Sequence, residues 1–103
     1  MKARVILTRG ERSLVEAGVE LTKSVLVPAA RRHPGYRGYV ALYDAERGFG
    51  MAVTLWEDEH AEQDSDDAMR ESREQFAQAY GAEVTVEKYD VAVVDYVESP
   101  GWT

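Results

Sequence analysis

The chain has 103 residues, of which 45% are hydrophobic and 30% are charged, and its net charge is −7. A chain of this length forms one domain, which we place over residues 1–97 with a tail over 98–103, and buries about two-thirds of its unfolded surface. It contains no cysteine, which excludes disulfides, thiolate nucleophiles and metal sites with cysteine ligands. Because no apolar run approaches the ~18 residues that cross a bilayer and no basic leader precedes an apolar stretch, we expect a soluble, cytoplasmic protein.

The charges are distributed unevenly along the chain. Residues 1–50 carry nine Lys and Arg against five Asp and Glu, whereas residues 51–103 carry three against fourteen. The acidic residues are concentrated between Glu57 and Glu74, and a surface of that sign repels phosphate groups. Since no basic stripe with interleaved aromatic residues is present, we expect neither a nucleic acid nor an anionic membrane as a partner.

A strand and an interrupted helix open the chain. Residues 3–8 are short, β-branched and alternating, which predicts a buried strand. Ser13 and Glu16 have the spacing of a capping box and predict the start of a helix. Pro28 interrupts the apolar stripe of that helix, so we expect a kink or a break over residues 25–27 and helix again over 29–33.

The middle of the chain predicts a hairpin. Residues 36–44 and 49–56 alternate as strands do, and residues 45–48 have the composition of the turn between them. Both faces of both strands are largely apolar. An antiparallel sheet with one face in water normally shows polar residues on that face, so something must cover the second face.

A long helix and a last strand complete the pattern. Asp58 is suited to cap a helix that runs to Tyr80, and Gly81 is suited to end it. The apolar stripe of this helix is thin and made of small residues, so the helix either approaches the sheet closely or leaves an enclosed, mainly apolar cavity beneath it. Residues 83–97 read as a strand whose alternation changes phase, which indicates a bulge or a strand that leaves its own sheet to pair with another.

The order of these elements, βαββαβ, predicts an α+β, ferredoxin-like fold with two helices on one face of an antiparallel sheet. The other face is apolar by its pattern. A contiguous apolar patch of that kind marks an interface, so we expect a homodimer through the sheet face. The alternative is an exposed face with scattered apolar residues and no partner.

Three segments carry a resemblance to a known family, namely Pro34–Gly38, Thr54–Glu57 and Val84–Tyr89. Over residues 3–96 the chain resembles the antibiotic biosynthesis monooxygenase family. The resemblance implies a dimeric α/β barrel with a cavity between the sheet and the helices of each subunit. It further implies oxidation of phenols, quinols or anthrones by dioxygen with no metal or flavin cofactor, while other members degrade haem.

Residue by residue, the resemblance carries over only in part. Trp56 matches the tryptophan that ends a strand in the anthrone-oxidising members. Their asparagine four residues earlier falls on Ala52, and their helix tyrosine falls on Glu62. The haem-degrading members have an asparagine where this chain has Ala3, so haem degradation is disfavoured.

Cofactor-free oxygenation needs a protein that deprotonates the substrate, holds the resulting anion and excludes water. Aromatic walls with polar tips suit such a planar ligand. The candidate substrate contacts are Trp56, Tyr39, Tyr43, His60, Met69 and Arg73. Each has an alternative role: the aromatic residues and Met69 as core or interface packing, and His60 and Arg73 as solvated side chains. Arg73 has no acidic residue three or four positions away, which leaves it freer to anchor a ligand.

The acidic run Asp64–Asp67 predicts no metal site, because a helix fans its carboxylates apart into a solvated face. Two functions therefore stay open. The first is a cofactor-independent monooxygenase acting on a small aromatic. The second is a non-catalytic dimeric protein that binds a small ligand or serves as an accessory protein on the same barrel.

Overall fold

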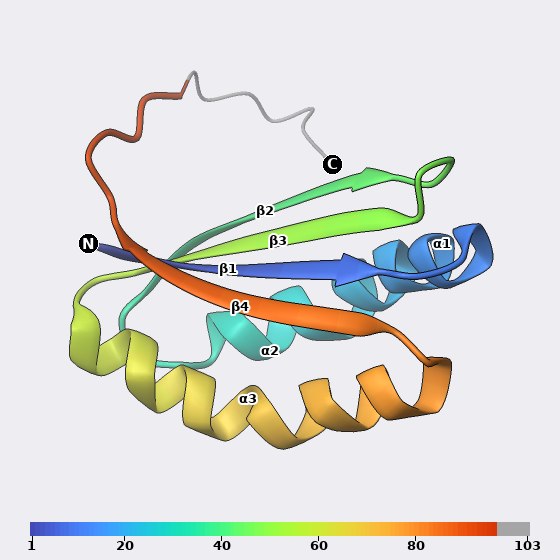
Figure 1. The fold of residues 1–103 in the computed structure, drawn as a ribbon. Coiled ribbons are helices and arrows are strands. Elements are labelled where there is room, and N and C mark those ends of the chain that lie inside the picture. The colour runs from blue at the N-terminus through green and yellow to red at the C-terminus, as the bar shows by residue number, and fades with distance from the viewer. Residues whose placement is uncertain (97–103) are drawn as a thin grey trace.

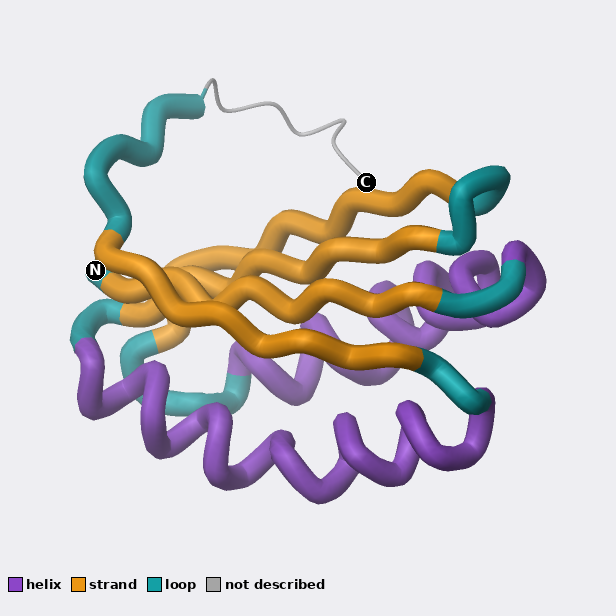
Figure 2. Tube along the Cα trace, in the orientation of Figure 1, coloured by secondary structure: helices purple, strands orange, loops and turns teal. Residues whose placement is uncertain are grey.

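The computed structural model describes residues 1–96, which form one antiparallel sheet covered on one face by helices (Figures 1 and 2). The elements in chain order are β1 (Lys2–Arg9), α1 (Arg12–Leu21), the π-helix η1 (Thr22–Leu26), α2 (Val27–Arg31), β2 (Tyr36–Asp44), β3 (Phe49–Trp56), α3 (Glu59–Tyr80) and β4 (Glu83–Asp90). The strand order is β2-β3-β1-β4. This architecture confirms the predicted α+β, ferredoxin-like fold.

The register of the sheet decides which side chains meet the helices. Arg4 in β1 lies opposite Thr54 in β3 on one side and opposite Lys88 in β4 on the other. Because side chains alternate between the two faces of a strand, these three point to the same face. Arg4 hydrogen-bonds residues of α3, so this is the helix-covered face.

The opposite face of the sheet is largely apolar over β2, β3 and β1, as the sequence pattern predicts, and is polar along β4, where Glu83, Thr85 and Glu87 lie on it by register. Val40 and Leu42 in β2 and Tyr89 in β4 belong to this face by register, and each is about half exposed. No helix covers them in the part of the chain that the structure describes (Figure 2).

The first helix starts earlier than predicted, and the predicted capping box is wrong. The N-cap residue is Glu11, no side chain caps the helix, and Ser13 lies within its first turn. The segment before the helix is held against the turn between β2 and β3, because the Gly10 N–H donates to the Gly48 carbonyl at 2.9 Å. Gly48 has φ +65°, and a Cβ there would lie 2.0 Å from the Gly10 oxygen, so only glycine fits.

Pro28 produces a π-helical turn instead of a break. The helical run continues from Arg12 to Arg31, with η1 between its two α-helical parts. Proline has no N–H to donate and its ring clashes with the carbonyl four residues earlier, which favours a local change of register. The Val27 N–H accordingly donates to the Thr22 carbonyl, five residues back. The Thr22 hydroxyl bonds the Gly18 carbonyl at 2.8 Å in the turn before.

The second long helix has the predicted ends. The Asp58 side chain accepts a hydrogen bond from the Ala61 N–H at 2.8 Å, and Gly81 ends the helix with φ +63°. None of the helices within residues 1–96 combines the length and the apolar character that crossing a bilayer requires.

The last strand is shorter than predicted. Its pairing with β1 runs without a shift from Glu83 to Asp90, so no bulge interrupts it. It ends there because its pairing partner β1 begins at Lys2, which lies opposite Asp90. Beyond that pair, the Val91 N–H donates to the Met1 carbonyl at 3.0 Å. The following residues turn away on the side of the sheet opposite the helices (Figure 1). Val97 and the predicted tail 98–103 lie outside the described residues.

Candidate functional site

A fully buried arginine occupies the centre of the layer between the sheet and α3. Arg4 has 0% exposure, and its Nη1 donates to the Glu62 carboxylate at 2.9 Å, to the Ser65 hydroxyl at 2.9 Å and to the Glu62 carbonyl at 3.0 Å. Its Nη2 lies 3.8 Å from the Met69 sulfur. Its guanidinium carbon lies 5.3 Å from the centre of the Trp56 ring. A buried charge with this many partners ties β1 to α3.

The Asp66 carboxylate forms ion pairs with three other cationic side chains. Its carboxylate lies 2.8 Å from Arg73 Nη2, 3.1 Å from Lys88 Nζ and 3.3 Å from Arg70 Nη2. Burial alone would raise the pKa of Asp66, but hydrogen bonds from Arg73 and Lys88 and the charges of Arg73 and Arg4 lower it to about 2. Burial would lower the pKa of Lys88, but its bonds to Glu62 and Asp66 raise it.

Trp56 is packed on all sides at the end of β3. Its exposure is 0%, and its indole N–H donates to the Thr54 hydroxyl at 2.9 Å. The rings of His33 and Tyr36 meet it edge-on, with centroids at 6.4 and 5.9 Å. Such edge-to-face contacts stabilise an aromatic core beyond the area that it buries.

The structure brings three of the six predicted site residues together around Arg4. Trp56 and Met69 contact its guanidinium group, and Arg73 reaches it through Asp66. Tyr39 shares their face of the sheet, where burial raises the pKa of its hydroxyl and the neighbouring Thr22 hydroxyl offsets part of that effect.

The other two predicted site residues lie apart from this cluster. Tyr43 is 60% exposed on the edge strand β2. His60 is exposed on α3, where its Nε2 lies 3.2 Å from Asp64. Neither belongs to the layer around Arg4.

Two expectations about charged side chains are wrong. Arg73 is not free of acidic partners, because α3 brings Asp66, seven residues earlier and two turns away, onto the same side of the helix. The run Asp64–Asp67 is not a uniformly solvated face, because Asp66 is turned inward and is 3% exposed. No metal-binding group of three or more acidic or histidine side chains occurs within residues 1–96.

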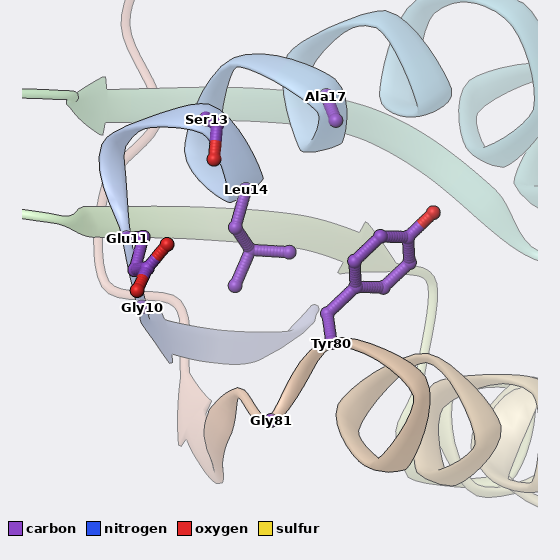
Figure 3. Close-up of a pocket in the computed structure, with 7 residues that line it drawn as sticks. All are labelled: Gly10, Glu11, Ser13, Leu14, Ala17, Tyr80 and Gly81. Carbon is purple, nitrogen blue, oxygen red and sulfur yellow. The ribbon is translucent and has the colours of Figure 1, made fainter.

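An open groove lies beyond the charged layer, between the start of α1 and the end of α3 (Figure 3). Its volume is about 490 Å³. The residues that line it are Gly10, Glu11, Ser13, Leu14, Ala17, Tyr80 and Gly81. The expected enclosed apolar cavity beneath the long helix is therefore wrong, because paired charged side chains fill the space beneath the first half of α3 and the groove at its other end is open.

A smaller hollow lies at the other end of α3. Its volume is about 180 Å³, and His33, His60 and Ser65 are among the residues that line it. It adjoins the Trp56 cluster through His33, which contacts the Trp56 ring. Of the predicted site residues, only His60 lines either hollow.

The central residues of the charged layer were not predicted from the sequence, although two signals point to them. Arg4 interrupts an otherwise apolar strand, and a charged residue in a buried strand needs a partner. Glu62 and Asp66 are four residues apart on one helix face, the spacing that can present two carboxylates to one arginine.

We predict that Asp66 makes folding sensitive to acid. Its pKa is lower in the folded state than the ordinary 3.8, so its contribution is present above pH 3.8 and is lost as the pH falls towards 2. The shift corresponds to about 2 kcal/mol. Urea unfolding of the wild type and of Asp66→Asn should show a stability difference that shrinks over this pH range. A difference that stays constant would contradict the assignment.

The fold of this chain is similar to the folds of several solved structures. No protein-family model and no curated protein matches the sequence. Solved structures do match. A protein of Deinococcus radiodurans provisionally named an antibiotic biosynthesis monooxygenase aligns with a TM-score of 0.74 and 11% identity over 96% of this chain and 100% of its own.

Two of the matching structures are named as oxygenases of Streptomyces. SnoaB of Streptomyces nogalater, a cofactor-independent oxygenase, aligns with a TM-score of 0.62 and 13% identity over 90% of this chain and 94% of its own. A monooxygenase from the gene ActVA-Orf6 of Streptomyces coelicolor, bound to nanaomycin D, gives a TM-score of 0.62 and 16% identity over 91% and 92%. At these identities the likeness establishes the fold, which is the one that the resemblance to antibiotic biosynthesis monooxygenases predicts.

Proposed function

We propose that this chain is a cofactor-independent monooxygenase of the antibiotic biosynthesis type that oxidises a small aromatic compound with dioxygen. The observation that carries the proposal is the fold, shared over at least 90% of the chain with two structures named as oxygenases, one of them cofactor-independent. The substrate class is a phenol, a quinol or an anthrone-like compound. Such compounds, once deprotonated, can give an electron to dioxygen without help from a metal or flavin.

The groove between α1 and α3 supplies a place for such a substrate. Its volume of about 490 Å³ lies within the range of small-molecule sites. Leu14 and Ala17 give it an apolar side, and the Tyr80 ring stands on the other side (Figure 3). A planar aromatic ring can stack on tyrosine and displace water from these apolar surfaces.

In this reaction, the protein needs to do little beyond binding the substrate and orienting it. The substrate anion reduces dioxygen, the two combine at carbon, and loss of water leaves a carbonyl group, so one oxygen atom enters the product and the other leaves as water. Holding the anion in place and limiting water are the protein's tasks.

A second candidate is a non-catalytic protein that binds a small ligand or serves as an accessory protein. Two observations favour it. The groove is open along one side, which excludes water poorly, and Ala52 on the helix-covered face offers no hydrogen bond to a substrate carbonyl. Both candidates require the groove to bind a planar aromatic.

Oxygen uptake with a panel of hydroquinones and anthrones tests both candidates. Ala17→Trp should fill the groove without disturbing the core, because Ala17 is exposed on α1. Val25→Trp is the matched control, since Val25 is 49% exposed and does not line the groove. We expect uptake by the wild type and by Val25→Trp, and its loss in Ala17→Trp. Ligand binding without uptake would select the second candidate, and absence of both would reject the two together.

We further propose that the chain forms a homodimer through the helix-free face of the sheet. The apolar side chains of that face support this, and so does the segment after β4, where Val93 is 80% exposed and Tyr96 is 73% exposed. Sedimentation at micromolar concentration should show a dimer, and Leu42→Lys should weaken it. A wild-type species of 11.6 kDa would reject the dimer.

The cytoplasmic location stays a prediction, which cell fractionation checks.

A further inference from the structure

The oxidation proposed for this chain needs a group that takes the proton from the substrate hydroxyl. Among the residues of 1–96 that line the groove between α1 and α3, Glu11 carries the one carboxylate. The other polar side chains there belong to Ser13 and Tyr80, and an un-ionised hydroxyl is a much weaker proton acceptor than a carboxylate. Glu11 is therefore the candidate base of this groove.

The segment that joins β1 to α1 holds Glu11 at the groove. Glu11 is the N-cap residue of α1, and its carbonyl accepts the Val15 N–H at 3.1 Å. Gly10, just before it, is tied to the Gly48 carbonyl. The backbone is thus held on both sides of Glu11, whereas its side chain forms no capping hydrogen bond. The carboxylate stays free for a ligand.

The two arginines next to Glu11 in the sequence are engaged with other groups. Arg12 pairs with Glu46 at 3.7 Å, and the Arg9 guanidinium carbon lies 5.1 Å from the centre of the Phe49 ring. Neither neutralises Glu11 by an ion pair in the part of the chain that the structure describes. The other charged or titratable groups on the elements around Glu11 are Asp44, Glu46 and Arg47 at the β2–β3 turn, Tyr80 in α3, and Glu83 in β4.

A substrate ring fits between Tyr80 and Glu11. Figure 3 shows the Leu14 side chain between these two residues. Leu14 packs closely against Gly10, where a Cβ would lie 2.2 Å from the Leu14 Cδ2 atom. A ring that lies on Leu14 and stacks on Tyr80 can place a hydroxyl group at the Glu11 end of the groove.

We propose that Glu11 is the catalytic base of this site and that the groove takes neutral phenols with a free hydroxyl group. This proposal rests on the proposed monooxygenase function. A substrate that carries its own carboxylate would bring a second negative charge next to Glu11, so such compounds should be poor substrates.

Glu11 takes the proton and later returns it. The hydroxyl proton passes to the Glu11 carboxylate as one electron passes from the phenol to dioxygen. The superoxide formed joins the substrate radical at a ring carbon that bears hydrogen, and the resulting peroxide takes the proton back from Glu11. The O–O bond then breaks, and hydroxide leaves with the proton of that carbon as water, which forms the carbonyl group. Substrate, dioxygen and Glu11 together carry one negative charge at every stage.

The test compares oxygen uptake by the wild type and by Glu11→Gln, with the compound of the panel that the wild type oxidises fastest. Glutamine has the same size and can accept a hydrogen bond from the hydroxyl, but it cannot take the proton. We expect kcat to fall by about 100-fold or more and KM to change by less than about threefold. Glu16→Gln removes the same charge from an exposed position of α1 outside the groove and should change neither constant.

The pH dependence of uptake separates a base from a group that only shapes the groove. Without the base, only substrate that is already ionised in solution can react. The value of kcat/KM for Glu11→Gln should therefore rise about tenfold per pH unit below the pKa of the substrate, and more steeply than the wild-type value. Glu11→Asp keeps a carboxylate and should recover part of the uptake.

Failure of this proposal differs from failure of the monooxygenase. Uptake that Glu11→Gln retains, a loss that Glu16→Gln shares, a change in KM alone, or parallel pH profiles would each overturn the base and leave the monooxygenase. No uptake by the wild type would reject both. Since Glu11 is exposed, urea unfolding of Glu11→Gln should match that of the wild type and so exclude misfolding as the cause of lost uptake.

Discussion

Arg4→Met is expected to lower the free energy of unfolding by about 3–5 kcal/mol, the range for breaking a buried ion pair by removing one partner. Methionine fills much of the space of arginine, so the loss comes from charge. Without the guanidinium group, the Glu62 carboxylate keeps Lys88 as its one cationic partner among residues 1–96, in a layer where its side chain is 4% exposed. Urea unfolding at pH 7 measures the change.

Two further variants isolate the cause. Arg47→Met removes an arginine whose side chain is 83% exposed and whose partner is Asp44, so it should cost less than about 0.5 kcal/mol. Adding Glu62→Gln to Arg4→Met removes the unpaired carboxylate and should recover part of the loss. If Arg4→Met and Arg47→Met were equally stable, the buried layer would not hold α3 to the sheet.

Trp56→Ala is expected to cost about 3–5 kcal/mol, the range for removing a large buried aromatic side chain. The ring is 0% exposed and packs against His33, Tyr36 and the Arg4 guanidinium group. Its removal leaves a cavity and also takes away the donor to Thr54. Thermal unfolding followed by the remaining aromatic signals, together with urea unfolding, measures the effect.

Trp56→Phe is the matched variant for this prediction. Phenylalanine keeps most of the packing and loses only the indole N–H, so the expected cost is about 1–2 kcal/mol. The contrast also tests the role of Trp56 in the proposed oxygenase. Because the ring is fully packed, Trp56→Phe should retain oxygen uptake at a temperature where it is folded. Abolished uptake in a stable Trp56→Phe protein would instead indicate a substrate contact.

The charged layer and the open groove divide the underside of the sheet between them. Ion pairs fill the first half of the space beneath α3, and the groove opens where α3 ends near the start of α1 (Figure 3). Helix α3 is therefore attached by buried polar contacts at one end and borders the groove with Tyr80 at the other.

The six residues predicted as substrate contacts lie in different parts of the structure, and that role stays a prediction for each of them. Trp56, Met69 and Arg73 were predicted by residue type, and all three lie around Arg4. Tyr43 and His60 were predicted by the same criterion and lie elsewhere. Residue type and helical spacing do not reveal which strand residue faces which helix turn, because that depends on how the two elements pack.

The sequence by itself determined the elements and their order, because strand alternation, the Asp58 cap and the Gly81 stop act over a few residues. It also indicated that the hairpin strands β2 and β3 are largely apolar on the face that no helix covers in residues 1–96. Only the tertiary structure decided that β4 ends at Asp90, since that limit is set by where β1 begins. It alone decided that Arg4 and Asp66 are buried partners, because contacts between residues 62 positions apart arise from packing that no local pattern records.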